Sequence, residues 1–209
     1  MSRENSFENK RVVIIGGSSG IGLAVAEESA SQGADVVIVS SKAERVQEAI
    51  KPIGGDVRGE AVDVSDEKAV ESLFTNTGDF DHLVFSAGDS LQLHELADTD
   101  LKETRRAFEL RYWAALAAVK YGSPHIRKGR LYRPHHWSCQ PTPSQGMGSG
   151  GKCLRNNRSL NSFPGGRVGA PIRVNAVSPG VVRTKLWQNM NADERKHLYD
   201  SVGKSLPVG

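Results

Sequence analysis

Apolar and polar residues alternate in blocks that predict strands and helices in turn along the first half of the chain. Runs of mostly β-branched residues predict buried strands at 11–15, 34–40, 57–64 and 82–85, and a later run predicts another at 172–177. Helical spacing of apolar residues predicts helices that begin near Gly22, at 44–50, after Asp66 and over about 100–121. Strands that alternate with helices predict an α/β fold built on a parallel sheet.

The turn between the first predicted strand and its helix is rich in glycine. Gly16 allows a tight turn, Gly20 lets backbone N–H groups approach a phosphate, and Gly22 allows the helix to pack closely on the strand. Ser18, Ser19 and Ile21 belong to the same turn and are candidate binding residues together with the glycines. The turn therefore predicts a cradle for a dinucleotide pyrophosphate at a helix N-terminus, with an ordinary strand-turn-helix as the alternative.

Composition places the chain among ordinary globular proteins. Of its 209 residues, 38% are hydrophobic and 24% are charged, and the formal net charge of +3 is too small to favour a nucleic-acid partner. The sequence holds no apolar run long enough to favour a membrane span, and its first ten residues lack the apolar centre of a signal peptide. We therefore expect a cytoplasmic protein whose two cysteines are reduced.

Four separated motifs resemble those of the short-chain dehydrogenase/reductase family, and they stand in the family's order. They are the glycine turn at 16–22, Asp63-Val64, Ser86-Ala87-Gly88, and the turn from Ser178-Pro179-Gly180 to Thr184. Ser86 stands where the family has an asparagine. The resemblance implies a single domain, 1–209, with a doubly wound, Rossmann-like parallel sheet, and an oxidoreductase that binds a nicotinamide dinucleotide.

The resemblance also implies roles for residues outside the glycine turn. The aspartate would contact the adenine, the Ala-Gly turn would lie along the cofactor, and the last turn would hold the nicotinamide carboxamide. The residues expected at the cofactor on this basis are Asp63, Val64, Ser86, Ala87, Gly88, Pro179, Gly180, Val182 and Thr184. A helix cap is the alternative role for Asp63.

The residues after the second predicted strand predict which dinucleotide is bound. An acidic residue there would bind the ribose 2′-hydroxyl, whereas a basic residue would accept a 2′-phosphate. This chain has Ser40, Ser41 and Lys42, and so no carboxylate to repel a phosphate. We therefore predict NADP(H) as the cofactor, with Ser41 and Lys42 at its 2′-phosphate; a solvated lysine at a helix start is the alternative for Lys42.

The acid-base residues of the family have no counterpart in this chain. Counting back from Pro124, the position of the family's helical asparagine falls on Arg111. No Tyr-x-x-x-Lys motif stands between 129 and 170; Tyr132 has His136 at that spacing, but Pro134 would break a helix between them. The sequence therefore assigns no catalytic residue.

The window from about 130 to 169 shows neither helix nor strand periodicity, and we expect it to be irregular or disordered. With synonymous codons chosen for 144–170, reading one nucleotide later gives PKGWAVAASVCGTIEALTPSRAVELA, which resembles the family's fifth helix and joins the chain at Pro171. We therefore predict that this window is translated out of frame relative to the ancestral gene. The chain also stops before the family's last helix and strand, so we expect the sheet to be incomplete after residue 129.

Other candidate sites are weaker. The spacing of His125, His135, His136, Cys139 and Cys153 matches no paired-ligand pattern, so no metal site is expected. The basic residues at 127–130 predict a solvated turn rather than a nucleic-acid site. The residues after Thr184 predict either a pocket for an apolar substrate or ordinary helix core; they are Leu186, Trp187 and Met190.

Three functions follow from these observations. The first is an NADP(H)-dependent oxidoreductase that acts on a carbonyl or alcohol carbon of a small molecule. The second is a catalytically silent dinucleotide-binding protein, and the third is a non-functional product of a frame-shifted gene. The resemblance leaves the oligomeric state open: family members often pair, but the expected loss of the last helix and strand would reduce the contact surface of a homo-oligomer.

Overall fold

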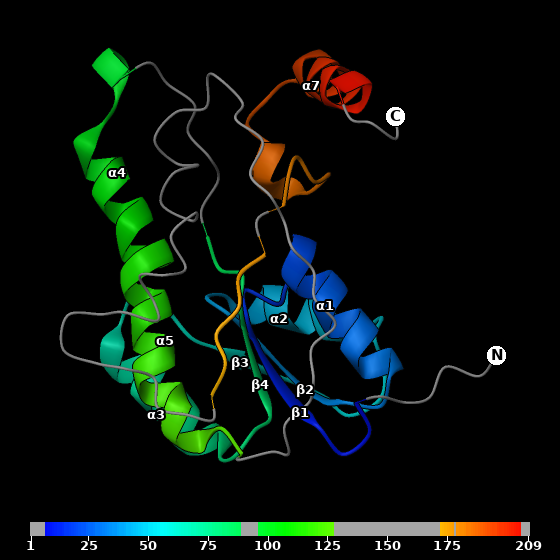
Figure 1. Ribbon diagram of the computed structural model, residues 1–209, viewed down its shortest axis with the longest axis vertical. Helices are drawn as coiled ribbons and strands as arrows, with labels where there is room; N and C mark the ends of the chain where they lie inside the picture. Colours follow the sequence, from blue (N-terminus) through cyan, green and yellow to red (C-terminus); the bar gives the residue numbers. More distant parts are fainter. Residues whose placement is uncertain (1–6, 89–95, 128–171, 178, 206–209) are drawn as a thin grey trace.

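The computed structural model describes residues 7–88, 96–127, 172–177 and 179–205 (Figure 1). The predicted out-of-frame window at 130–169 lies outside these residues, as do Ser178 and 206–209.

Four parallel strands form the sheet in the order β3-β2-β1-β4. They are β1 (Arg11–Ile15), β2 (Asp35–Ser40), β3 (Val57–Ala61) and β4 (His82–Phe85). In register, Ile14 of β1 lies between Ile38 of β2 and Val84 of β4. The chain thus adds β2 and β3 on one side of β1 and then returns to place β4 on its other side, which confirms the predicted Rossmann-like sheet.

Helices cover both faces of this sheet (Figure 1). On one face lie α1 (Gly20–Ser31) and α2 (Ala43–Ile50). On the other lie α3 (Glu67–Thr77) and a long helix made of α4 (Leu101–Phe108), a π-helical turn (Glu109–Trp113) and α5 (Ala114–Gly122). Asp66 caps α3 as predicted, since its carboxylate accepts from the N–H groups of Lys68 and Ala69.

The core consists of two hydrophobic clusters, one on each face of the sheet. Val12 and Ile14 of β1 pack with Ala26 of α1 and Ala49 of α2. Val13 and Ile15, which alternate with them, belong to the other cluster, with Val70, Leu73 and Phe74 of α3 and Ala114 and Ala118 of α5. Because the last four of the five residues of β1 are at most 2% exposed, this strand is the centre of the fold.

Three sequence predictions differ from the structure. The strand predicted at 57–64 ends at Ala61, where its pairing with Ser40 of β2 ends. The helix predicted at about 100–121 is continuous but contains the π-helical turn, and one such turn is too short to change the apolar pattern of a long helix visibly. The strand predicted at 172–177 is absent: in the described part of the chain these residues pair with no strand, and Val177 is 89% exposed.

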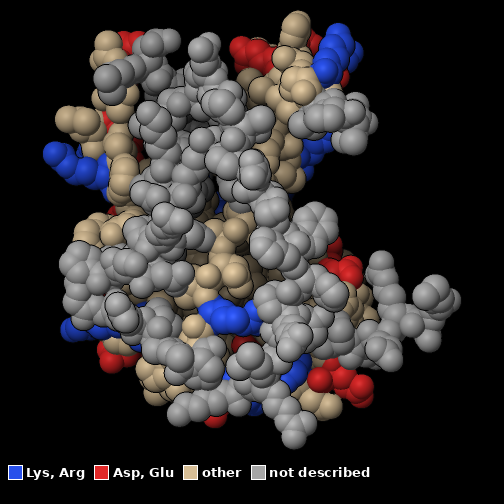
Figure 2. All heavy atoms as spheres, in the orientation of Figure 1, with Lys and Arg blue, Asp and Glu red and all other residues tan. Residues whose placement is uncertain are grey.

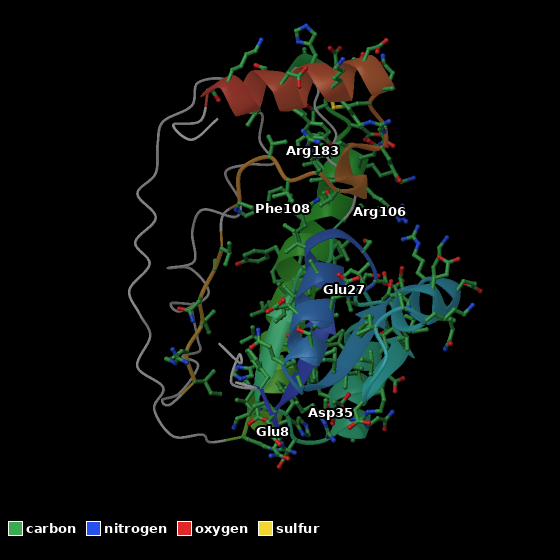
Figure 3. The ribbon with its side chains drawn as sticks, turned by 90° about the vertical axis from the view of Figure 1, so that its right-hand side faces the viewer. Glu8, Glu27, Asp35, Arg106, Phe108 and Arg183 are labelled. Atoms are coloured by element: carbon green, nitrogen blue, oxygen red, sulfur yellow. The ribbon has the colours of Figure 1, made fainter. Side chains whose placement is uncertain are left out.

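An ionic network closes the amino edge of the sheet. Asp35 at the start of β2 accepts from Arg11 of β1 at 2.6 Å and from Arg58 of β3 at 2.9 Å, so three neighbouring strands are joined (Figure 3). Burial alone would raise the pKa of Asp35, but hydrogen bonds and charges of the two arginines outweigh it and lower this pKa. The ionised carboxylate therefore stabilises the folded chain.

A second carboxylate at the same edge joins β1 to β4. Asp81 accepts from the backbone N–H of Arg11 at 2.9 Å and lies within 3.2 Å of the Lys10 ammonium and 3.1 Å of the Arg127 guanidinium. Burial acts to raise the pKa of Asp81, but these donors lower it overall. Both aspartates thus hold strands together at the edge opposite the glycine turn.

We expect the Asp35 network to make stability depend on acid pH. Because the folded-state pKa lies below the ordinary value of 3.8, its contribution is present above pH 3.8 and is lost as the pH falls through the folded-state value. Replacing Asp35 with asparagine should lower the free energy of unfolding at neutral pH, and the difference from wild type should shrink below pH 3.8. Urea titrations at several pH values measure this, with the exposed Asp56→Asn as control. A difference that stays constant with pH would contradict the assignment.

Candidate functional site

The glycine turn lies at the carboxyl edge of the sheet, between β1 and α1. Gly16 and Gly20 have φ angles of 85° and 55°, in the left-handed region that favours glycine. The backbone N–H of Gly16 donates to the carbonyl of Val39 at 2.8 Å, which ties the turn to β2. Since α1 begins at Gly20, its first unpaired N–H groups face this turn, as an anion-binding helix N-terminus requires.

The Ser86-Ala87-Gly88 turn after β4 packs directly against the glycine turn. A Cβ atom added at Gly16 would lie 2.5 Å from the backbone nitrogen of Ala87, and one added at Gly22 would overlap the Gly16 carbonyl and the Ser86 hydroxyl. Ser86 donates its hydroxyl toward the carbonyls of Ile15 and Gly16, both 3.2 Å away. The structure therefore joins two of the predicted motifs at the point where the strand order reverses, which is where doubly wound sheets bind ligands.

The predicted 2′-phosphate residues lie at the end of β2. Ser18 of the glycine turn donates its hydroxyl to that of Ser40 at 2.8 Å, which links the turn to this strand. Ser41 and Lys42 follow and are exposed, and Lys42 immediately precedes α2. Both side chains are therefore accessible from solvent beside the glycine turn.

Asp63 does not cap a helix, because Asp66 does. Its carboxylate accepts from the backbone N–H of Ser65 at 3.0 Å and from the Ser65 hydroxyl at 2.7 Å. These hydrogen bonds, together with the charge of Arg106 on α4, lower the pKa of Asp63. The side chain of Val64 belongs to the core, so only its backbone could face a ligand.

The last predicted motif meets the first one in space. A Cβ atom added at Gly20 would lie 3.3 Å from the methyl carbon of Thr184, so this threonine packs on the glycine turn. Its hydroxyl accepts from the N–H of Leu186 and caps a 3₁₀ turn (Lys185–Trp187). Pro179 and Gly180 are exposed, and nothing lies within 4 Å of a Cβ added at Gly180.

Trp187 is a structural residue of this region. It is 7% exposed, and its indole N–H donates to the carbonyl of Val182 at 2.9 Å. The sequence left pocket and core as alternatives for Trp187, and the structure places it in the core. The helix α7 (Ala192–Ser205) follows, its start capped by reciprocal hydrogen bonds between Asn191 and Glu194.

A cavity of about 530 Å³ runs from the glycine turn along the outer side of α1. Its walls are mainly apolar, and they are formed by Phe7, Gly20, Ile21, Ala24, Val25, Glu28, Ser29, Val182, Arg183 and Thr184. The sequence pointed to Ile21, Val182 and Thr184 but missed the exposed side of α1. The helical spacing of Ile21, Ala24 and Val25 was the signal that could have shown an apolar surface there.

Sequence reasoning also passed over Arg111 as a site residue. It lies in the π-helical turn, and its guanidinium stands against Gly88: a Cβ added at Gly88 would lie 2.9 Å from the guanidinium carbon. The available signal was an arginine at the position of the family's helical asparagine.

The described residues form neither a metal cluster nor a membrane-spanning helix. In the ranges 7–88, 96–127, 172–177 and 179–205, no three metal-binding side chains gather and no helix has both the length and the apolarity to cross a membrane. On the face drawn in Figure 2, the described basic and acidic side chains are interspersed.

Comparison with known proteins decides the family. The sequence model described as an SDR-like Rossmann domain matches residues 3–201. The chain belongs to the short-chain dehydrogenase/reductase family. Membership makes it an oxidoreductase by homology and implies a nicotinamide dinucleotide as cofactor.

Relatives within the family share close to a third of this dehydrogenase/reductase's residues. It is 31% identical over 210 residues to the short-chain dehydrogenase/reductase fsr5 of Gibberella fujikuroi, with 88% of this chain and 75% of fsr5 covered. It is 29% identical over 212 residues to ucsE of Acremonium sp, with 88% and 76% covered.

A solved dehydrogenase/reductase from Sinorhizobium meliloti 1021 is 30% identical with a TM-score of 0.55, over 59% of this chain and 52% of that one. The match thus spans about half the length of that structure.

We expect Gly22→Ala to destabilise this dehydrogenase/reductase, because the added methyl group has no space between the two turns. The cost should be about 1–3 kcal/mol, as for other overpacked sites. Gly203→Ala is the matched control: it also lies in a helix, but nothing lies within 4 Å of its added Cβ. That variant should be as stable as wild type or gain up to about 1 kcal/mol. Chemical denaturation measures both, and equal effects would contradict the close approach.

Proposed function

We propose that this chain binds NADP(H) at the carboxyl edge of its sheet and transfers a hydride to or from the carbonyl or alcohol carbon of a small molecule. The observation that carries the proposal is the packing of the glycine turn against Ser86-Ala87-Gly88 beside the N-terminus of α1. Backbone N–H groups and the helix dipole would hold the pyrophosphate there. Thr184, which packs on Gly20, would stand at the nicotinamide end.

The preference for NADP(H) over NAD(H) rests on the end of β2. An exposed ammonium at Lys42 and hydroxyls at Ser40 and Ser41 suit a 2′-phosphate, whereas a carboxylate that would pair with a free ribose is absent from these three positions. The Ser18–Ser40 hydrogen bond supports the proposal by fixing the strand end beside the phosphate cradle.

We expect Lys42→Gln to weaken NADPH binding while leaving NADH binding unchanged. Loss of a charge-assisted contact should raise the Kd for NADPH about five- to tenfold. Isothermal titration with both dinucleotides measures this, and Lys51→Gln, at the exposed far end of α2, is the matched control. Equal weakening of both dinucleotides, or a wild-type preference for NADH, would overturn the choice of NADP(H).

One observation favours a second candidate function. The sequence between 129 and 170 holds no Tyr-x-x-x-Lys motif, so the proton that must accompany the hydride has no assigned donor. A protein that binds NADP(H) without turnover would need only the residues described above. Binding and turnover must therefore be measured separately.

We expect NADPH to bind with a micromolar Kd and to be oxidised when aldehydes and ketones are supplied. Positioning the cofactor beside the substrate can supply part of the rate acceleration even without a proton donor. Turnover should therefore be slow but faster than the reaction without protein. The decrease of NADPH fluorescence over time measures the rate of oxidation. The Gly22→Ala variant, in which the packing of the two turns is expected to be disturbed, shows whether that rate depends on the intact cradle. Tight binding with no turnover would favour the silent dinucleotide-binding protein, whereas no binding at millimolar NADPH would reject both functions.

A further inference from the structure

The π-helical turn gives Arg111 an unusual position in the long helix. Glu109–Trp113 form this turn between α4 and α5, where one added residue shifts the side chains relative to a regular helix. Such turns are frequent at functional sites. Here the turn lies on the face of the sheet opposite α1, level with the carboxyl edge (Figure 1).

The guanidinium of Arg111 lies against the turn after β4. A Cβ atom at Gly88 would stand 2.9 Å from the guanidinium carbon and 3.0 and 3.1 Å from its two terminal nitrogens. The side chain is half-buried. Arg111 thus places a permanent positive charge beside Ala87-Gly88, which packs in turn on Gly16.

A guanidinium in this place is suited to bind an anion. It has five N–H donors in a planar fork that matches two oxygens of a carboxylate or phosphate. Arg111 already has a contact within the fold, and its positive charge remains whichever donors that contact uses. Half-burial beside the sheet edge lowers the local dielectric, which strengthens the attraction for an anion relative to a fully exposed arginine.

We propose that Arg111 binds an anionic oxygen group of the molecule held at the carboxyl edge and makes the site specific for that group. The inference rests on the proposed function, because a dinucleotide lying along Ala87-Gly88 would pass beside this guanidinium. The group is either a phosphate of the dinucleotide or a carboxylate on the substrate next to it. Both have the same chemistry toward a guanidinium, and the experiment separates them.

The test compares Arg111→Gln and Arg111→Lys with Arg105→Gln, an exposed arginine of the same helix. The first measurement is the Kd for NADPH by isothermal titration. The second is the rise in melting temperature, in saturating NADPH, caused by straight-chain 2-oxo acids and by their methyl esters. Melting curves without ligand report whether each variant is folded, and Arg111→Lys keeps the charge if the glutamine variant does not fold.

Each result has one meaning. A rise of about tenfold or more in the Kd for NADPH in Arg111→Gln, absent in Arg105→Gln, supports a phosphate partner. Unchanged NADPH binding, with loss of a wild-type preference for the oxo acids over their esters, supports a carboxylate partner. If Arg111→Gln matches Arg105→Gln in both measurements, Arg111 only supports the fold and the inference is wrong while the proposed function stands. If wild type binds no NADPH, the proposed function fails and the inference fails with it.

Discussion

Burial of β1 on both faces is the constraint on which the rest of the structure depends. Its alternate residues belong to two separate hydrophobic clusters, one under α1 and α2 and the other under α3 and α5. A strand that must be covered on both sides needs helical connections on both sides, which fixes the winding of the chain. The reversal of strand order beside β1, and with it the ligand crevice, is a result of that packing rather than a separate feature.

The crevice is made mainly of backbone, and this explains why glycine dominates it. Gly16 and Gly22 bring two turns and a helix start so close that side chains there would collide with backbone groups. What a ligand meets first is therefore a set of N–H groups and a helix dipole, which recognise phosphate without regard to the rest of the molecule. Under the proposals above, selectivity would come from side chains at the rim, namely Lys42, Arg111 and Thr184.

Sequence reasoning recovered the four strands, the helices between them and the glycine turn, because each depends on local patterns. It missed features that depend on distant partners. Ile172, Val174 and Ala176 have strand-like spacing, but a strand exists only when another strand shares its hydrogen bonds. The position of Trp187 depends on a hydrogen bond to the carbonyl of Val182, and that of Arg111 depends on packing against Gly88 in a different turn. The spacing of apolar residues along the chain predicts neither contact.

The two edges of the sheet carry different kinds of charge interaction. At the amino edge, Asp35 and Asp81 tie four strands together through the side chains of Arg11, Arg58 and Lys10 and the backbone N–H of Arg11. At the carboxyl edge, Lys42 and Arg111 stand beside the crevice. Because these ion pairs lie at the edge opposite the glycine turn, substitution of an exposed rim side chain such as Lys42 leaves them in place. A change of rim residue at the carboxyl edge can therefore alter what binds there without loss of the ion pairs that join the strands.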